Sequence, residues 1–232
     1  MAQYARQVVL DTETTGLDPA LGHRVIEIGA LEVVNRRMTG ATYHVYLNPD
    51  REIDAGAVAV HGITNDFLAD KPRFADVAGE FMEFVRDAEL VIHNAPFDVG
   101  FLNAELKRLD EGPLSRTCGV LDTLKLAKAL HPGQKNNLDA LCKRYQVDNS
   151  GRNFHGALLD AQLLAEVYLA MTRGQETLSI EAVAPQAAVQ GQIDRPLRRG
   201  AIKVLRPSEA EQAAHSAYLA GLEKEAGSLT PW

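Results

Sequence analysis

The hydrophobic pattern changes its period near residue 74, and this change limits the folds that the chain can adopt. Before that point, Val8–Leu10, Arg24–Val34 and Thr42–Leu47 have strand-like patterns, joined by segments short enough for antiparallel neighbours. After it, helical spacing dominates, with one short buried strand at Leu90–Ile92. The segments with helical spacing are 74–86, 98–109, 121–130, 138–145 and 157–171. A meander of strands followed by alternating helices and strands predicts an α/β fold with a mixed sheet flanked by helices.

The charge balance restricts how the chain can bind other molecules. Its 232 residues carry a formal net charge of -7, and the pI is about 5.5. That balance argues against a protein that binds nucleic acid through a broad basic face. It is compatible with an enzyme whose carboxylates hold cations, because bound metal ions reverse the local charge.

Cysteine usage and the absence of long apolar runs indicate the compartment. Cys118 and Cys142 lie outside any C-x-x-C pair or zinc-ligand spacing, so we expect reduced thiols. The N-terminal residues are polar and lead directly into a strand, and no apolar run reaches membrane length. We therefore expect a cytoplasmic protein without a membrane partner.

The composition of the chain changes after residue 174. Residues 175–200 are rich in Gln, Ala and Pro and lack a hydrophobic period, as linkers do. Residues 201–232 regain an apolar stretch and a capping-box pattern, in which Ser208 is followed by Glu211. The sequence predicts a folded domain over 1–174 and a flexible C-terminal tail. The tail comprises a linker over 175–200 and a segment over 201–232 that is too short for its own core and folds on a partner.

Two acidic residues end the first predicted strand. Asp11 and Glu13 lie two positions apart, so both carboxylates face the same side of the sheet. Such acids repel each other and lose hydration, and a divalent cation removes both penalties. Carboxylate oxygens are the ligands that Mg²⁺ and Mn²⁺ prefer. Taken alone, the Asp-x-Glu pattern is more often a pair of exposed acids at a strand end than a metal site.

Three further polar residues stand at the ends of other predicted elements. Asp98 begins a helix after a Pro-containing turn, where it could cap that helix or face a metal-bound water. His155 precedes the helix that contains Asp160, on a Gly-flanked loop that suits a general base. A lone His is more often an ordinary surface or core imidazole. His93 and Asn94 are expected to fix their turn through hydrogen bonds.

Taken together, these residues form a pattern of much higher specificity. The order Asp-x-Glu, Asp, His-x4-Asp resembles the His-containing branch of the DEDD exonuclease superfamily. Within that branch, the chain is similar to the epsilon-type subunits of bacterial DNA polymerase III. The stretches that carry the similarity are DTETTGL, VHGIT, HNAPFD, NNLDALC and FHGALLDAQLLAEVYL. The resemblance covers about 6–174 and resumes near the C-terminus.

The resemblance implies a fold and a set of roles. The fold would be an RNase H-like core, a five-stranded mixed sheet with flanking helices. Asp11, Glu13 and Asp160 would hold two divalent cations, Mg²⁺ or Mn²⁺, and Asp98 would complete the acidic cluster. His155 would accept a proton in metal-assisted phosphodiester hydrolysis. The residues implied to contact the substrate are Asp11, Glu13, Thr14, His61 and Asp160.

The resemblance also implies a function and partners. The chain would be the proofreading 3′–5′ exodeoxyribonuclease of a bacterial replicative polymerase, acting on a single-stranded or frayed DNA 3′ end. Residues 175–180 resemble the peptide that binds the sliding clamp, with Gln175, Leu178 and Ile180 as its contacts. The segment 201–232 resembles the part that binds the catalytic alpha subunit. A small accessory subunit is a further possible partner.

One departure and two alternatives remain open at this point. The family often has an acid near the nucleotide sugar, five residues before the position of His61, where this chain has Gly56. An RNA-directed 3′ exoribonuclease would share the same five catalytic residues, although it would not need the tail. A scaffold that links clamp and polymerase would need the tail but not the catalytic residues.

Overall fold

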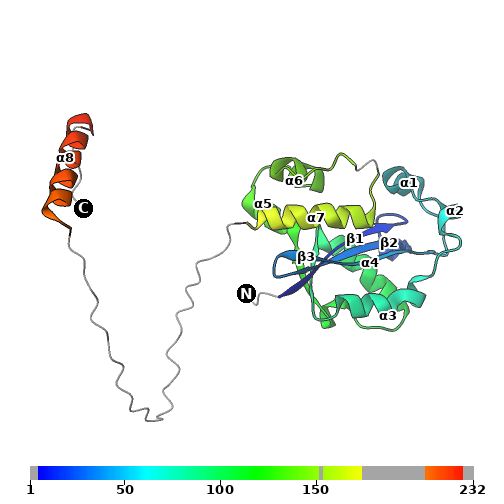
Figure 1. Ribbon diagram of the computed structural model, residues 1–232. Helices are drawn as coiled ribbons and strands as arrows, with labels where there is room; N and C mark the ends of the chain where they lie inside the picture. The colour runs from blue at the N-terminus through cyan, green and yellow to red at the C-terminus, as the bar shows by residue number, and fades with distance from the viewer. Residues whose placement is uncertain (1–4, 152–153, 174–206, 227–232) are drawn as a thin grey trace, which may run out of the picture. The chain divides into compact units, whose positions relative to one another are not determined.

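The computed structural model describes residues 5–151, 154–173 and 207–226 (Figure 1). The chain divides into two compact units, Met1–Ser179 and Ile180–Trp232. The first holds a five-stranded sheet with helices on both faces. In the second, the structure describes one helix, α8 (Glu209–Ala226).

The sheet is mixed, and its strand order β3-β2-β1-β4-β5 places β1 at the centre. The strands are β1 (Arg6–Thr14), β2 (Val25–Val34), β3 (Arg37–Tyr46), β4 (Glu89–Ile92) and β5 (Gly119–Asp122). β1 pairs antiparallel with β2 and parallel with β4. The expected five-stranded mixed sheet is therefore confirmed. β1 therefore has one antiparallel and one parallel neighbour. In α/β sheets, ligands commonly bind at the carboxyl end of a strand where the chain connections change direction in this way.

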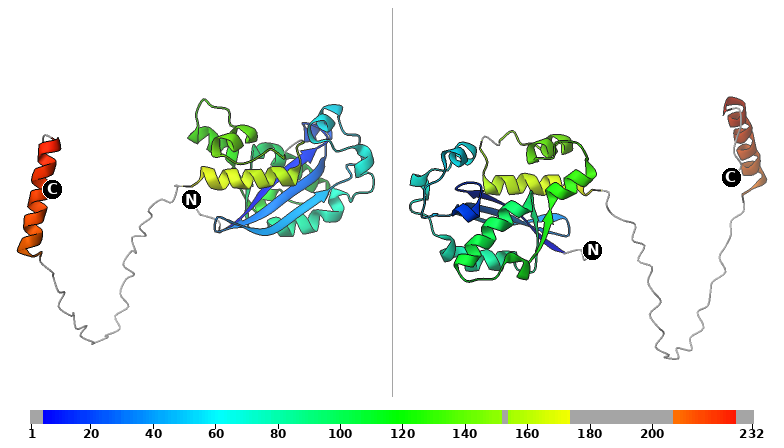
Figure 2. Two further views of the ribbon diagram at one scale, coloured as in Figure 1. Left: turned by 45° about the horizontal axis from the view of Figure 1, so that its top comes forward. Right: turned by 180° about the vertical axis from the view of Figure 1, so that it is seen from behind.

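Helices cover both faces of the sheet, as the two views of Figure 2 show. One face packs against α3 (Phe74–Val85) and α4 (Ala95–Arg108). The other packs against α5 (Thr123–Leu130), α6 (Leu138–Tyr145) and α7 (Ala157–Met171). Phe81 and Phe101 are almost fully buried on the first face, and each contributes roughly 1.5–3 kcal/mol by burial. These layers form the core that holds β1 in place.

A glycine in β2 sets the distance between the sheet and α7. A Cβ added at Gly29 would overlap the backbone of Ala157 and Leu158. Gly29 also pairs with Asp11 across the β1–β2 ladder. The first turn of α7 therefore crosses the sheet directly beside Asp11, and this crossing places Asp160 next to the two acids of β1.

The strands β1 and β3 are longer than the hydrophobic pattern predicts. The pattern over Val8–Leu10 marks only the middle of β1, because pairing with β2 continues to Thr14 and ends in an irregular register after Glu13. The third strand begins at Arg37, not at Thr42, because Asn35 and Arg36 adopt positive φ and form a tight hairpin turn. Neither residue is a glycine, so the turn had no clear signal in the sequence.

Two helix boundaries also differ from the prediction. Residues 121–130 were expected to be one helix, but β5 runs to Asp122 and α5 begins at Thr123. Asp122 separates them, because its side chain accepts the N–H groups of Leu124 and Lys125 as the cap of α5. α4 begins at Ala95, so Asp98 lies in its first turn and is not its cap.

Short helices form the remaining connections of the first unit. They are α1 (Ala55–His61), α2 (Asn65–Leu68) and the 3-10 helices η1 (Pro19–Leu21) and η2 (Leu114–Arg116). His61, one of the implied substrate contacts, is the last residue of α1. Both cysteines are buried thiols and are not joined in a disulfide, as expected.

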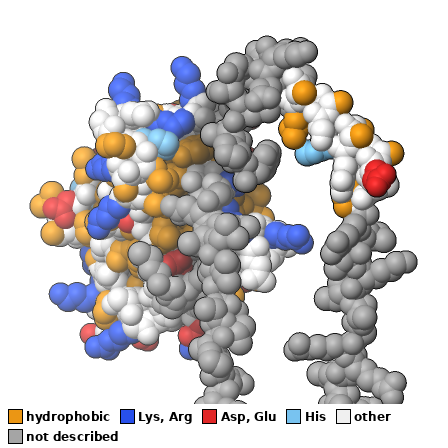
Figure 3. All heavy atoms as spheres, turned by 90° about the vertical axis from the view of Figure 1, so that its left-hand side faces the viewer, with side chains coloured by type: hydrophobic (Ala, Val, Ile, Leu, Met, Phe, Trp, Pro, Cys, Tyr) orange, Lys and Arg blue, Asp and Glu red, His pale blue; other side chains and the backbone are white. Residues whose placement is uncertain are grey.

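The helix α8 starts with the expected cap. The N–H of Ser208 donates to Glu211 Oε2 at 2.7 Å, and the N–H of Glu211 donates to Ser208 Oγ at 3.3 Å. Within the described parts of the chain, no helix combines the length and apolar character needed to cross a membrane. On the face drawn in Figure 3, Lys and Arg side chains of the first unit are scattered among other side chains and do not gather into one patch.

Candidate active site

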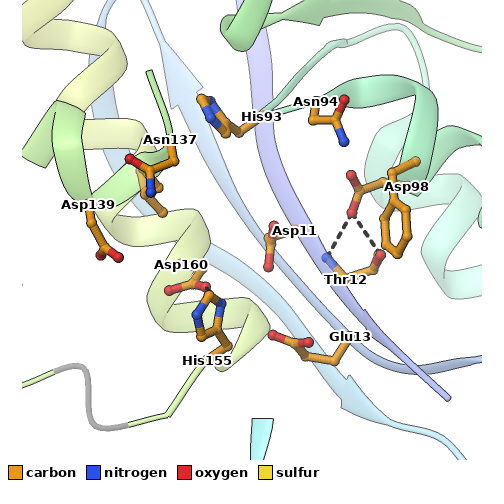
Figure 4. Close-up of a pocket in the computed structure, with 12 residues that line it drawn as sticks. Asp11, Thr12, Glu13, His93, Asn94, Asp98, Asn137, Asp139, His155 and Asp160 are labelled. Atoms are coloured by element: carbon orange, nitrogen blue, oxygen red, sulfur yellow. Dashed lines mark hydrogen bonds and ion pairs between the residues drawn. The ribbon is translucent and has the colours of Figure 1, made fainter. Parts of the chain in front are cut away.

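The five residues predicted to carry the chemistry line one cavity of about 260 Å³ at the carboxyl end of β1. They are Asp11, Glu13, Asp98, His155 and Asp160 (Figure 4). They come from β1, from the first turns of α4 and α7, and from the loop before α7. Residues up to about 150 positions apart in the sequence therefore meet because β1 lies between the two helices that carry the other acids.

The β1 acids point into the cavity from the same side of the sheet, as their spacing predicts (Figure 4). Asp11 is half-buried and Glu13 is buried. Glu13 lies at the last regular position of the β1–β2 ladder, before the register shifts. The backbone of both residues is thus fixed by strand pairing, and their carboxylates need no flexible loop to reach the site.

Asp160 and His155 complete the side of the site formed by α7. Asp160 lies in the first turn of α7 and is 3% exposed. His155 Nδ1 lies 3.3 Å from Asp160 Oδ2. Donor atoms of Glu13, His155 and Asp160 all lie within 4.8 Å of one another, close enough to share one metal ion. Carboxylate oxygens dominate this set, which suits Mg²⁺ or Mn²⁺ better than a softer metal.

His155 occupies an accessible position outside the helix, as predicted. Its side chain is 47% exposed. Its backbone N–H donates to Val60 O at 3.2 Å, which attaches this loop to α1. The imidazole can therefore reach solvent and a substrate while its backbone remains anchored.

Asp98 has a different environment from the other acids. Its Oδ1 accepts the backbone N–H of Thr12 at 3.1 Å and the Thr12 hydroxyl at 2.7 Å. Burial raises the pKa of Asp98 from 3.8 to about 7, although the hydrogen bonds from Thr12 act in the opposite direction. This carboxyl group is held by the centre of β1 and changes its charge near neutral pH.

Several polar residues of the cavity were not predicted as site residues. Thr12 lies between the two predicted acids and bonds Asp98 from the opposite side of the strand. Asn137 and Asp139 line the cavity from the start of α6, where Asn137 caps the helix. The NNLDALC stretch signalled this helix start but gave no reason to place it at the site. His93, expected to fix its turn, bonds Thr123 Oγ1 at 3.0 Å.

A second cavity of about 480 Å³ adjoins the first and shares Thr12, Glu13 and Phe97 with it. Its walls are largely apolar, and its other lining residues are Thr14, Gly16, Leu17, Asp54, Gly56, Ala57, Val60 and His61. The volume falls in the range of small-molecule pockets, roughly 300–1,000 Å³. The two predicted substrate contacts outside the acidic cluster, Thr14 and His61, both belong to this cavity.

His61 is anchored at one ring nitrogen. Its Nδ1 accepts the N–H of Ile63 at 3.0 Å. Its Nε2 is buried and makes no hydrogen bond of normal geometry among the described residues. Burial is the main cause that lowers the pKa of His61, which favours the neutral ring. The backbone of Thr14 acts on the ring in the direction opposite to burial. A buried ring nitrogen that makes no well-aligned hydrogen bond costs free energy, and a ligand in the second cavity would offset that cost.

The proposed clamp contacts Gln175, Leu178 and Ile180 lie outside the described residues. So do residues 201–206 and 227–232 of the expected polymerase-binding segment.

Comparison with known proteins adds three findings from sequence. A family model described as an exonuclease matches residues 8–168. The chain is 52% identical over 232 residues to the DNA polymerase III subunit epsilon of Escherichia coli strain K12, and the match covers 96% of both chains. It is 46% identical over 226 residues to the corresponding subunit of Rickettsia felis, covering 95% of this chain and 98% of the relative.

Solved structures with the same fold include nucleases bound to DNA. Exonuclease X in complex with 5′-overhanging duplex DNA has a TM-score of 0.58 and 29% identity, covering 72% of this chain and 90% of that one. The zinc-bound complex of E. coli exonuclease I with single-stranded DNA has a TM-score of 0.64 and 22% identity, covering 73% of this chain and 41% of the other. The second likeness concerns the fold alone.

Proposed function

The chain belongs to the exonuclease family and to the relatives of the DNA polymerase III epsilon subunits, and from this premise we propose how its site removes nucleotides from DNA 3′ ends. The function is that of the proofreading 3′–5′ exonuclease of a DNA polymerase III. The observation that carries the proposal is the convergence of Asp11, Glu13, Asp98, His155 and Asp160 on one cavity. An alternative as a free-standing RNA exonuclease is disfavoured, because the similarity to epsilon subunits spans nearly the whole chain, including the tail.

The donor set fits divalent cations. Glu13 and Asp160 are buried carboxylates beside His155, with Asp11 facing the same cavity. Such a group of acids is unfavourable without counter-charge, since buried like charges repel and lose hydration. We assign Asp11, Glu13 and Asp160 as ligands of two cations, Mg²⁺ or Mn²⁺. When bound, the cations would supply positive charge at the scissile phosphate and lower the pKa of a water molecule.

His155 serves as the general base. An exposed imidazole that lies beside the acidic cluster can accept a proton from the attacking water and pass it to solvent. The contact between His155 Nδ1 and Asp160 Oδ2 orients the ring toward the acidic cluster. The attachment of the loop to Val60 limits how far the ring can move between substrate molecules.

Asp98 positions the neighbouring ligands through its hydrogen bonds with Thr12, which lies between Asp11 and Glu13. Its two hydrogen bonds from Thr12 fix both Asp98 and the β1 residue between the two acids of that strand. In the ionised form, Asp98 adds negative charge to the site and accepts hydrogen bonds from water beside the cluster. Asp98 and Asp160 are the least accessible acids of the set, and each is 3% exposed.

The second cavity holds the terminal nucleoside. Leu17, Ala57, Val60 and Phe97 provide apolar walls for a base, and the cavity opens onto the acidic cluster through Glu13. A nucleoside there would present its 5′ phosphate to the carboxylates. The buried Nε2 of His61 would gain a hydrogen-bond partner. Because the pocket takes one nucleoside at a chain end, cleavage would proceed from that end.

The tail would connect the exonuclease to its assembly. Similarity to epsilon subunits places the chain in a DNA polymerase III that acts on DNA. We assign residues 201–232 to the catalytic alpha subunit and Gln175, Leu178 and Ile180 to the sliding clamp. A small accessory subunit on the exonuclease domain and a cytoplasmic location complete the proposal. Replacing Leu178 and Ile180 by Ala should abolish clamp capture by the immobilised chain, and undiminished capture would contradict the clamp assignment.

The test of the catalytic proposal is hydrolysis of a 5′-labelled DNA primer with a mispaired 3′ end. With Mg²⁺, the full chain should produce a ladder of products that shorten one nucleotide at a time. EDTA or Asp11→Asn should stop it, whereas Asp66→Asn serves as a matched control because Asp66 is exposed on α2 and lines neither cavity. An RNA primer is measured in parallel. Internal cleavage products, or faster hydrolysis of RNA than of DNA, would contradict the proposal.

A further inference from the structure

One acid of the nucleoside pocket has no role in the account above. Asp54 lines the second cavity together with Glu13, and these are its two acidic residues. Glu13 belongs to the proposed cation site. Asp54 lines the same cavity from the start of α1.

The side chain of Asp54 does not cap the helix at whose start it lies. Asp54 occupies the N-cap of α1, where Asp normally accepts N–H groups of the first turn. Its side chain makes no such capping hydrogen bond. Instead, Asp54 Oδ2 lies 3.5 Å from His23 Nε2. The carboxylate is therefore directed away from its own helix and toward a residue of another loop.

The backbone of Asp54 is also tied to the turn that follows β1. Its N–H donates to Thr15 O at 3.0 Å. Thr15 is fully buried, and its neighbour Gly16 lines the same cavity. The two walls of the pocket, the turn after β1 and the start of α1, are joined at Asp54.

The ring of His23 lies between Thr15 and Asp54 and contacts both. The Thr15 hydroxyl oxygen accepts the N–H of Arg24 at 3.0 Å and lies 3.0 Å from His23 Nδ1. Since Thr15 Oγ1 accepts from Arg24, its own proton is available to donate to Nδ1. In the ring tautomer that accepts this proton at Nδ1, Nε2 carries the ring proton and points it toward Asp54. A Cβ at position 16 would overlap the His23 ring, so Gly16 is what allows this arrangement.

Ligands can reach the carboxylate. The Asp54 side chain is 58% exposed although its backbone and one oxygen are held. Next to it, a Cβ built at Gly56 meets no atom within 4 Å, so the mouth of the pocket is open on that side. An anchored but accessible carboxylate at the mouth of a nucleoside pocket is a recognition group for a hydroxyl, because a carboxylate accepts hydrogen bonds and repels anions.

We propose that Asp54, positioned by His23, recognises the 3′-hydroxyl of the terminal nucleotide and rejects a terminal 3′-phosphate. The inference rests on the proposed function, because it requires that the second cavity hold the terminal nucleoside. It deepens that function by stating which DNA ends the enzyme accepts. The charged carboxylate accepts the hydroxyl hydrogen, and it repels a phosphate at the same place.

Binding of mononucleotides tests this proposal without requiring catalysis. Calorimetry with the full chain and Mg²⁺ measures Kd for thymidine 5′-monophosphate, its 3′-deoxy analogue and thymidine 3′,5′-bisphosphate. The wild type should bind the first of these most tightly. Asp54→Asn should reduce the preference over the bisphosphate about ten-fold or more, since a charge-assisted hydrogen bond and a repulsion are lost together.

Glu52→Gln is the matched control. It removes the same charge from an exposed residue of the same loop that lines neither cavity. The ratios of the three Kd values should equal those of the wild type in Glu52→Gln. His23→Asn should reduce the preference as Asp54→Asn does, because the carboxylate loses its anchor.

The outcomes separate this proposal from the proposed function. Unchanged Kd ratios in Asp54→Asn, or an equal change in Glu52→Gln, overturn the role of Asp54 whether or not the enzyme hydrolyses DNA. Hydrolysis of primers ending in a 3′-hydroxyl or a 3′-phosphate is measured alongside. A wild type that releases no nucleotide from either primer counts against the proposed function, while the Kd ratios still decide the role of Asp54.

Discussion

The buried carboxyl group of Asp98 should make the stability of the cation-free protein depend on pH. Burial raises its pKa from 3.8 to about 7 in the folded chain, whereas an unfolded Asp titrates near 3.9. Between these values the folded protein holds a proton that the unfolded chain has released. The resulting stabilisation is fully present below about pH 4 and is lost as the pH rises through about 7.

The magnitude follows from the size of the shift. A change of about three pKa units corresponds to about 4 kcal/mol, since each unit is 1.36 kcal/mol, and this is a ceiling for the whole effect. Between pH 5 and pH 8, about two of those units are traversed, or about 2.7 kcal/mol. Asp98→Asn has no proton to lose there, and its amide oxygen can still accept from Thr12.

Urea unfolding followed by circular dichroism, in EDTA, measures this effect. The free energy of unfolding of Asp98→Asn minus that of the wild type should increase by roughly 2–3 kcal/mol from pH 5 to pH 8. Using this difference removes contributions from other groups that titrate in both proteins. If the two proteins follow parallel pH profiles, Asp98 is not the group that holds the proton, and the reasoning from its burial is wrong.

Three further substitutions test other parts of the account. His155→Gln should lower the single-turnover rate about 10²-fold or more while the melting temperature stays unchanged, and a smaller loss would contradict its role as general base. Gly29→Ala should lower both melting temperature and activity by displacing the start of α7. Gly79→Ala, on α3 where an added Cβ meets no atom within 4 Å, should leave activity unchanged and should not lower the melting temperature, because Ala favours a helix more than Gly does. Arg24→Met should destabilise the fold by about 3–5 kcal/mol in urea unfolding, because it leaves Glu105, now bonded at 2.6 Å and 2.7 Å, buried and unpaired; a loss below 1 kcal/mol would show that the pair is not needed.

Much of the fold could be predicted from the hydrophobic period. The helices α6 and α7 begin and end at the predicted residues. α6 has an amphipathic pattern that starts after the capping residue Asn137, and α7 has a long apolar pattern that starts after Gly156. The strand β5 was missed because only four residues pair with β4, and their apolar pattern continues into α5. α1 and α2 are too short to show a period.

The candidate site was predictable for a different reason. Asp11, Glu13, His155 and Asp160 were recognised by their spacing and by family resemblance, and the fold brings them together. Thr12 was missed because its role depends on Asp98, which is 86 positions away in the sequence. Asp54 was missed because a helix cap and a ligand contact look the same in sequence. Only the structure shows that the carboxylate lies beside His23 and lines the second cavity, and that it does not cap its own helix.

The central claim is that the carboxylates of one cavity gather divalent cations around the phosphate of a terminal nucleotide. Titration with Mn²⁺, followed by the electron paramagnetic resonance signal of the free ion, measures this directly in the presence of thymidine 5′-monophosphate. We predict two Mn²⁺ ions per wild-type chain and a loss of tight binding in Asp160→Asn. Equal Mn²⁺ binding by the wild type and by Asp160→Asn would contradict the account.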